Sequence, residues 1–193
     1  MKILVWIPVI MTFTVTLHGQ QVEFYRENIV FLLSERSFIV NGDYYFRNNA
    51  HEQVKKLIYY PFGTFNSNES VDSVTVHNIT ANSIERILRM TPSGITFEAE
   101  IAGNDTVLYR VVYRQHIVSD SVRYILQTTK YWNKPLDRAE YTLVAESPVS
   151  VQTLSYPPDT LFQVRSMHIY RWWKEKFLPE SDMIIHFRVE GKN

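Results

Sequence analysis

The sequence contains no cysteine, only 6 glycines in 193 residues, and equal numbers of basic and acidic side chains, 20 of each. Without cysteine, disulfide bonds, thiolate zinc sites and a lipid-modified amino-terminal cysteine are excluded. The charge balance provides none of the excess positive charge by which proteins attract nucleic acids or anionic lipids. We therefore expect no nucleic-acid partner and a fold that holds together without covalent cross-links.

The first segment, residues 1–19, combines one cation, Lys2, with an apolar run that is interrupted by Pro8 and diluted by threonines. A bilayer-spanning helix needs about 20 predominantly apolar residues. A charged start followed by a shorter apolar run is instead typical of a secretory signal peptide. We expect cleavage after Gly19 or Gln20, an extracytoplasmic location (periplasm, cell surface or medium), and no stable membrane span in the mature chain. An uncleaved anchor and a buried core strand are the alternatives.

The remaining residues, 20–193, are enough for a single domain that buries a core without disulfides or a metal. No long repeat, low-complexity tract or block of like charge marks a linker. The one candidate break is the Ser-Tyr-Pro-Pro-Asp segment at 155–159. A single β-sandwich domain is therefore expected, with two packed sub-domains as the alternative.

Aromatic residues are abundant, with 12 Tyr, 11 Phe and 4 Trp, and they suit the half-buried surface of a pleated sheet. The clearest alternation, from Phe38 to Arg47, predicts one long strand with a wetter second face. Other strands are predicted at residues 29–33, 54–60, 73–78, 84–90, 95–101, 107–116, 123–129, 139–146, 149–154, 165–173 and 183–189.

This series of short strands without intervening amphipathic helices predicts an all-β fold. We expect an antiparallel β-sandwich, Ig-like or jelly-roll-like, with about ten or more strands. Turn residues at 91–94 (Thr-Pro-Ser-Gly) and 103–105 (Gly-Asn-Asp) each predict a hairpin. The segment 165–173 also fits a helical stripe, so strand is favoured there and helix stays open.

Five short segments carry a likeness to known proteins: 57–62, 124–129, 132–141, 170–172 and 177–185. The most distinctive is Trp-Asn-Lys-Pro-Leu-Asp-Arg-Ala-Glu-Tyr at 132–141. Together they resemble uncharacterised extracytoplasmic β-sandwich domains of bacteria, of the domain-of-unknown-function type, over about residues 22 to 190. The resemblance implies an exported β-rich domain and assigns no reaction and no functional residues.

Two of these segments have a structural explanation of their own. In 132–136, Pro135 cannot donate to a ladder, which predicts a strand exit with Trp132 covering a sheet edge. Residues 178–182 predict a polar turn ahead of the last strand. Neither segment indicates a catalytic or ligand-binding role.

Motifs for catalysis, metal binding and cofactor binding are missing. The sequence has no Gly-x-Ser-x-Gly elbow, no Gly-rich phosphate loop and no calcium loop. Glu98 and Glu100 share one strand face, as a pair of glycosidase acids could, but alternation with apolar residues indicates an ordinary solvent face. The histidines of the mature chain show no ligand spacing: His51, His77, His116, His168 and His186. We expect no enzymatic activity, no metal and no cofactor.

The aromatic stretch near the carboxyl end supplies the candidate contacts for a ligand or partner: His168, Tyr170 and Trp172. Rings along one strand face can stack on sugars or anchor a protein partner. Alternation places Trp173 on the opposite face, so one of the two faces is core, and core packing is the structural alternative for these rings.

Three functions follow, in order of preference. The first is an exported, non-enzymatic β-sandwich module that binds an envelope protein or a glycan, or has a structural role. The second is a carbohydrate-binding module that uses exposed rings near Tyr170 and Trp172, which burial of both rings would exclude. The third is a hydrolase whose site is assembled from loops.

Overall fold

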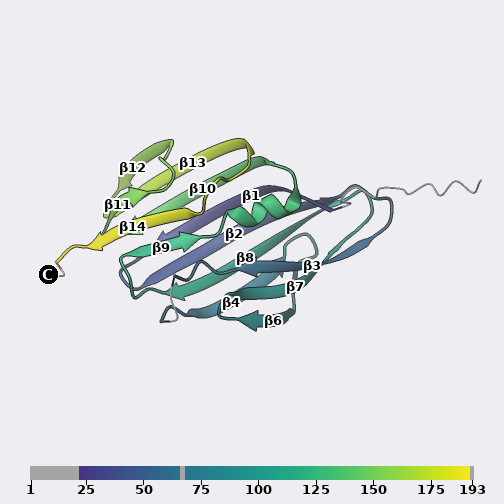
Figure 1. The fold of residues 1–193 in the computed structure, drawn as a ribbon, viewed down its shortest axis with the longest axis horizontal. Helices are drawn as coiled ribbons and strands as arrows, with labels where there is room; N and C mark the ends of the chain where they lie inside the picture. The colour runs from purple at the N-terminus through teal and green to yellow at the C-terminus, as the bar shows by residue number, and fades with distance from the viewer. Residues whose placement is uncertain (1–21, 66–67, 192–193) are drawn as a thin grey trace, which may run out of the picture.

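The alternating segments of the sequence form fourteen strands and one short 3-10 helix in the computed structural model, which describes residues 22–65 and 68–191 (Figure 1). The predicted signal peptide at 1–19 lies outside the described residues. Within the described part of the chain, no helix is long and apolar enough to cross a membrane.

Eight strands form one large sheet in the order β12-β13-β10-β1-β2-β8-β4-β5. All neighbours in it are antiparallel except β1 and β10, which are parallel. The sheet is therefore mixed, and the prediction of a purely antiparallel fold is wrong at this one pair. Its strands are β1 (Val22–Leu33), β2 (Ser37–Asn48), β4 (Val71–Asn78), β5 (Ser83–Ile84), β8 (Thr106–His116), β10 (Leu136–Glu146), β12 (Thr160–Val164) and β13 (Met167–Phe177).

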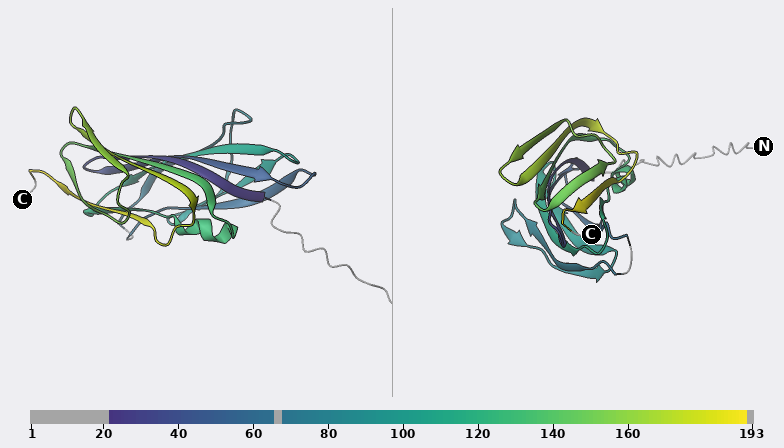
Figure 2. Two further views of the ribbon diagram at one scale, coloured as in Figure 1. Left: turned by 90° about the horizontal axis from the view of Figure 1, so that it is seen from above. Right: turned by 90° about the vertical axis from the view of Figure 1, so that its left-hand side faces the viewer.

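Two three-stranded sheets cover the inner face of the large one. The first has the order β3-β7-β6 and the second β11-β14-β9. In the end-on view of Figure 2 the large sheet curls round and the small sheets lie on its concave side. Their strands are β3 (Val54–Pro61), β6 (Ile87–Thr91), β7 (Gly94–Ile101), β9 (Ser121–Tyr124), β11 (Val149–Leu154) and β14 (Met183–Val189).

The core lies between the large sheet and its two covers. Phe97 of β7 packs on Tyr109 of β8 with ring centroids 5.4 Å apart, and Tyr124 of β9 packs on Phe31 of β1 at 5.1 Å. All four side chains are buried. Aromatic pairs at such distances stabilise a core beyond their area burial. The arrangement is an open β-sandwich-like one, which confirms the all-β prediction.

Several strand predictions need correction at their boundaries. The predicted strand at 84–90 is two strands, β5 and β6. The predicted strand at 123–129 ends at Tyr124, and the chain then forms the 3-10 helix η1 (Gln127–Trp132). Trp132 is therefore the last residue of a helix and does not follow a strand. The Asp182 carboxylate causes this change, because it accepts the backbone N–H groups of Leu126 and Gln127 at 3.0 and 3.2 Å.

The segment at 165–173 resolves in favour of strand. Arg165 and Ser166 form the turn of a hairpin between β12 and β13, and Arg165 has a φ of 55°. The helical alternative is therefore excluded. The apparent helical stripe arose because aromatic residues occur on both faces of β13.

One of the two predicted hairpins is confirmed and the other is wrong. The turn at 91–94 joins the paired strands β6 and β7, whereas the turn at 103–105 joins β7 to β8 in a different sheet. Asn48, which is buried, holds this corner: its amide nitrogen donates to the carbonyls of Glu52, Ile101 and Ala102 at 2.7, 3.2 and 3.1 Å. These bonds hold the corner at which the chain crosses from one sheet to the other.

Candidate functional site

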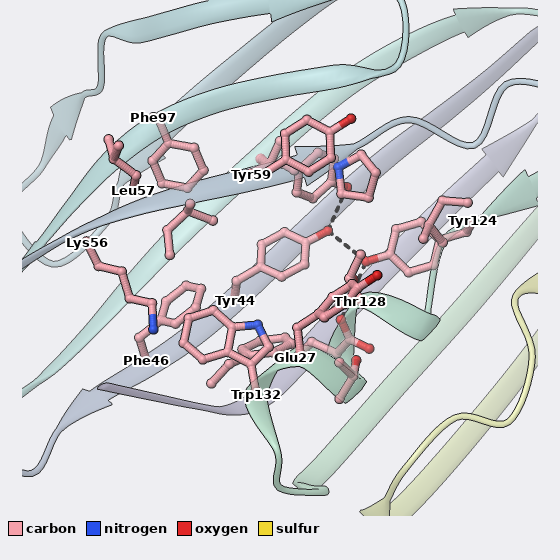
Figure 3. A pocket seen from close by; sticks show the side chains of 18 residues that line it. Glu27, Tyr44, Phe46, Lys56, Leu57, Tyr59, Phe97, Tyr124, Thr128 and Trp132 are labelled. Atoms are coloured by element: carbon pink, nitrogen blue, oxygen red, sulfur yellow. Dashed lines mark hydrogen bonds between the residues drawn. The ribbon is translucent and has the colours of Figure 1, made fainter. Parts of the chain in front are cut away.

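A pocket of about 540 Å³ opens between the two small sheets, over the inner face of β1 and β2. Its walls come mainly from β3 on one side and η1 on the other (Figure 3). Near Pro61 the two covers meet, since Arg123 Nη2 donates to the Thr64 carbonyl at 2.8 Å. The pocket has the size of a small-molecule site, which is typically about 300 to 1,000 Å³.

The carboxyl group of Glu27 lies in this pocket because of a β-bulge in β1. The register with β2 shifts between Phe24 and Arg26. A bulge adds one residue to the strand, so the inward-facing side chains are at even-numbered positions before it and at odd-numbered positions after it. Phe24 is buried before the shift, and Glu27 and Ile29 are buried after it. The bulge therefore keeps a carboxylate on the apolar face of the sheet, where it is 3% exposed.

The Glu27 carboxyl group and four tyrosine hydroxyls form one hydrogen-bonded network. Tyr141 donates to Oε1 of Glu27, and Tyr124 donates to Oε2 at 3.4 Å. The hydroxyl of Tyr44 lies 2.9 Å from that of Tyr124 and 2.8 Å from that of Tyr60 (Figure 3). The chain runs from Tyr60 on β3 to Glu27 on β1 and so connects one wall of the pocket to its floor.

Burial raises the pKa of Glu27 to about 7, although both phenolic hydrogen bonds act in the opposite direction. Burial disfavours the charged form of a carboxyl group, whereas donors to the carboxylate favour it. The same cause raises the pKa of Tyr44, Tyr60 and Tyr124 well above the ordinary value, so these phenols stay protonated. Glu27 is thus a carboxyl group that exchanges a proton near neutral pH.

Gly42 makes room for this chain. A Cβ atom there would lie 2.3 Å from the Tyr44 hydroxyl oxygen and 2.7 Å from Cδ1 of Ile29. The Tyr44 ring therefore lies over Gly42 along β2, which brings its hydroxyl group to Tyr124. A glycine inside a strand often marks such a close approach.

Aromatic side chains form the wall beside the floor. The ring of Trp132 lies 5.9 Å from that of Phe24 and 5.4 Å from that of Phe46, measured between centroids. Lys56 Nζ of β3 lies 4.4 Å from the centroid of Trp132. Burial lowers the pKa of this half-buried lysine. Lys56 thus places a cation at the rim of a pocket that is otherwise mainly apolar.

The candidate contacts predicted from sequence lie elsewhere. Tyr170 and Trp172 are 8% and 1% exposed, and Trp172 Nε1 donates to the Tyr156 carbonyl at 3.1 Å. These two rings belong to the core, so the carbohydrate-binding platform with exposed rings is excluded. His168 is half-buried on β13. Alternation did predict that Trp173 faces away from Trp172, and Trp173 is indeed 44% exposed.

Glu98 and Glu100 form the solvent face that alternation predicted. Both are exposed, and Lys55 Nζ lies 3.5 and 3.0 Å from their carboxylate oxygens. Among the residues that the structure describes, no group of three or more His, Cys, Asp or Glu side chains could hold a metal ion.

Sequence reasoning missed Glu27 because it started the first strand at Ile29. A signal was present, since the apolar alternation of Ile29, Phe31 and Leu33 extends back to position 27 on the same face. A glutamate in phase with three buried apolar residues indicates a buried carboxyl group. The two hydrogen-bond partners of Glu27 come from β9 and β10 and could not be paired with it from sequence.

The sequence matches no protein-family model and no curated protein. Its fold is similar to that of a crystal structure described as a "putative nutrient binding protein" from Legionella pneumophila, with a TM-score of 0.68 and 13% identity over 86% of this chain and 67% of that one. It is also similar to an M1 zinc metallopeptidase from Deinococcus radiodurans, with a TM-score of 0.51 and 10% identity over 87% of this chain. The chain spans only 43% of that peptidase. At these identities the likeness is one of fold.

Proposed function

We propose that the protein is an exported, non-enzymatic binding module that holds a small, mainly apolar ligand in the Glu27 pocket. The observation that carries this proposal is the pocket itself. It combines the volume of a small-molecule site, mainly apolar walls and a buried carboxyl group at the floor. Pockets with apolar walls and a few convergent polar groups are the usual form of ligand sites.

Other observations support the proposal. One structure of similar fold is described as a "putative nutrient binding protein". The charged and apolar start of residues 1–19 fits export. The resemblance to extracytoplasmic domains of bacteria is in line with both. An envelope protein or glycan as partner stays a prediction from sequence.

The test is a titration with N-phenyl-1-naphthylamine, an uncharged apolar probe whose fluorescence increases when it leaves water. We expect a saturable increase with the mature chain. Thr128→Phe should fill the pocket from η1 and weaken binding at least about tenfold, because the added ring occupies the space of the probe. Gln127→Phe is the matched control, since Gln127 is exposed on the same helix and does not line the pocket.

A fluorescence increase that does not saturate would contradict the proposal. So would equal affinities of the Thr128→Phe and Gln127→Phe variants. Circular dichroism of both variants shows whether the fold is retained.

A further inference from the structure

The charges of the pocket have an unusual distribution. Of its eighteen lining residues, only Glu27 and Lys56 belong to the Asp, Glu, Lys, Arg and His types. Glu27 lies at the floor and is 3% exposed, whereas Lys56 is half-buried on β3 beside Trp132. A ligand in this pocket therefore meets an acid at its inner end and a base at its outer end.

Within the described residues, no Lys, Arg or His side chain pairs with the Glu27 carboxylate, whose interactions are with tyrosine hydroxyls. Buried charges in proteins are normally paired or hydrogen-bonded on all sides. A carboxylate has about four acceptor sites, and Glu27 uses one for Tyr141 and one for the long 3.4 Å contact with Tyr124. The site thus has acceptor capacity for a further donor.

The hydroxyl chain strengthens this capacity. When Glu27 is ionised, Tyr124 donates to it, Tyr44 donates to Tyr124, and Tyr60 donates to Tyr44, since a carboxylate only accepts. All three hydroxyl protons then point toward the floor, and the Tyr60 oxygen is left as an acceptor at the β3 wall. Both ends of the chain accept hydrogen bonds, which favours a ligand group with several donors.

The aromatic wall also favours a cation. Trp132, Phe24 and Phe46 pack together beside the floor. The face of Trp132 already holds the Lys56 ammonium group at 4.4 Å. Aromatic faces attract cations, most strongly where water is excluded. An ammonium group suits this floor better than a hydroxyl group, because it brings three donors and the missing positive charge.

We propose that the ligand is a zwitterionic amino acid with an aromatic or large apolar side chain, its ammonium group bonded to the Glu27 carboxylate and its carboxylate facing Lys56. This inference rests on the proposed function and names the ligand class for the same pocket. The side chain of the ligand would contact the aromatic wall. The Glu27 carboxylate then has a partner of opposite charge in the complex.

Isothermal titration calorimetry with four compounds of one ring system tests the inference. L-phenylalanine carries both charged groups, phenethylamine only the ammonium, 3-phenylpropionate only the carboxylate, and 3-phenylpropan-1-ol neither. We expect L-phenylalanine to bind about 10- to 100-fold more tightly than either singly charged compound, the range that a hydrogen bond to a charged group gives.

Two variants test which residue of the pocket contacts the ammonium group of the ligand and which contacts its carboxylate. Glu27→Gln should weaken L-phenylalanine and phenethylamine by at least about tenfold and leave 3-phenylpropionate unchanged. Lys56→Met should weaken L-phenylalanine and 3-phenylpropionate and leave phenethylamine unchanged. Lys55→Met is the matched control, because Lys55 is the exposed neighbour on the same strand and pairs with Glu98 and Glu100. It should leave all four affinities unchanged.

The probe separates failure of this inference from failure of the proposed function. If the neutral probe binds but all four compounds bind equally, or none binds, the pocket takes apolar ligands and the zwitterion inference is wrong. If neither the probe nor any compound binds, both proposals are wrong. Retained probe binding by Glu27→Gln shows that the variant is folded and keeps its pocket.

Discussion

Two glutamates on β1, four residues apart, have opposite environments. Glu23 accepts hydrogen bonds from Arg47 at 2.9 and 3.1 Å and from Asn49 at 3.2 Å, and Lys134 lies 3.4 Å away. Among the residues that the structure describes, the partners of Glu27 are phenolic hydroxyls only. The Arg47 guanidinium lowers the pKa of Glu23 to about 2, whereas burial raises the pKa of Glu27 to about 7.

The difference arises from the bulge between the two residues. Before it, Glu23 lies beside the outer-face residue Arg47 of β2, its register partner, and the guanidinium binds the carboxylate through two nitrogens. After it, Glu27 faces the apolar interior. An acid paired by an arginine contributes to stability, whereas a buried acid without a cation costs stability when ionised.

Among the variants that test the contrast between Glu23 and Glu27, Glu27→Gln should have the largest effect on the free energy of unfolding. The folded pKa of about 7 lies above the ordinary 4.5. The stabilisation from the bound proton is therefore fully present below pH 4.5 and is lost as the pH rises through 7. It amounts to about 3 kcal/mol. A glutamine has no proton to lose, so the variant should not show this decrease.

Urea denaturation of the wild type and of Glu27→Gln at pH 4, 6 and 8 measures this loss of stability. The difference in unfolding free energy between variant and wild type should change by about 3 kcal/mol in favour of the variant between pH 4 and pH 8. A difference that is constant with pH would mean that Glu27 titrates like an exposed acid and that the contrast with Glu23 does not exist.

Arg47→Met should have the next largest effect and the opposite pH dependence. The stabilisation of Glu23 is present above pH 4.5 and is lost as the pH falls through 2, because its folded pKa is depressed. Arg47 is about one third exposed, so we expect a loss of about 1 to 2 kcal/mol at pH 7. The loss should become smaller as the pH falls toward 2, and a loss that stays the same would show that Arg47 acts through packing alone.

Gly42→Ala should have the smallest effect on stability and a specific effect on the hydroxyl chain. The added Cβ displaces the Tyr44 hydroxyl group and breaks two hydrogen bonds, while the removal of a strand glycine offsets part of this cost. We expect a net loss of about 1 kcal/mol. Tyr44→Phe removes the same hydrogen bonds without moving the ring and is the matched comparison. If Gly42→Ala is as stable as the wild type, the Tyr44 ring does not need the space over Gly42.

The sequence predicted the regular part of the fold well. Alternation in β2 placed Tyr44 and Phe46 on the inner face and Arg47 on the outer one, because period-two burial is a local property. The turn at 91–94 was predicted for the same reason. Features that depend on distant residues were missed, such as η1, whose start is fixed by Asp182, and the corner held by Asn48.

The pocket is also a feature that depends on residues far apart in the sequence. Its floor combines Glu27 with hydroxyl groups from β2, β3, β9 and β10, and the pairing depends on a bulge that the alternation pattern does not reveal. The aromatic stretch near Trp172 was predicted as a contact site because its rings are adjacent in sequence. Adjacent rings in a strand, however, mostly reflect core packing, and burial shows that this is so here.

The most direct test is a pH titration of the glutamate side-chain carboxyl signals by carbon-13 NMR, in which Glu23 serves as an internal comparison for Glu27. We expect midpoints of about 2 for Glu23 and about 7 for Glu27. A Glu27 midpoint at or below the ordinary 4.5 would contradict the account, because the pocket floor would then not hold a buried carboxyl group that lacks a cation.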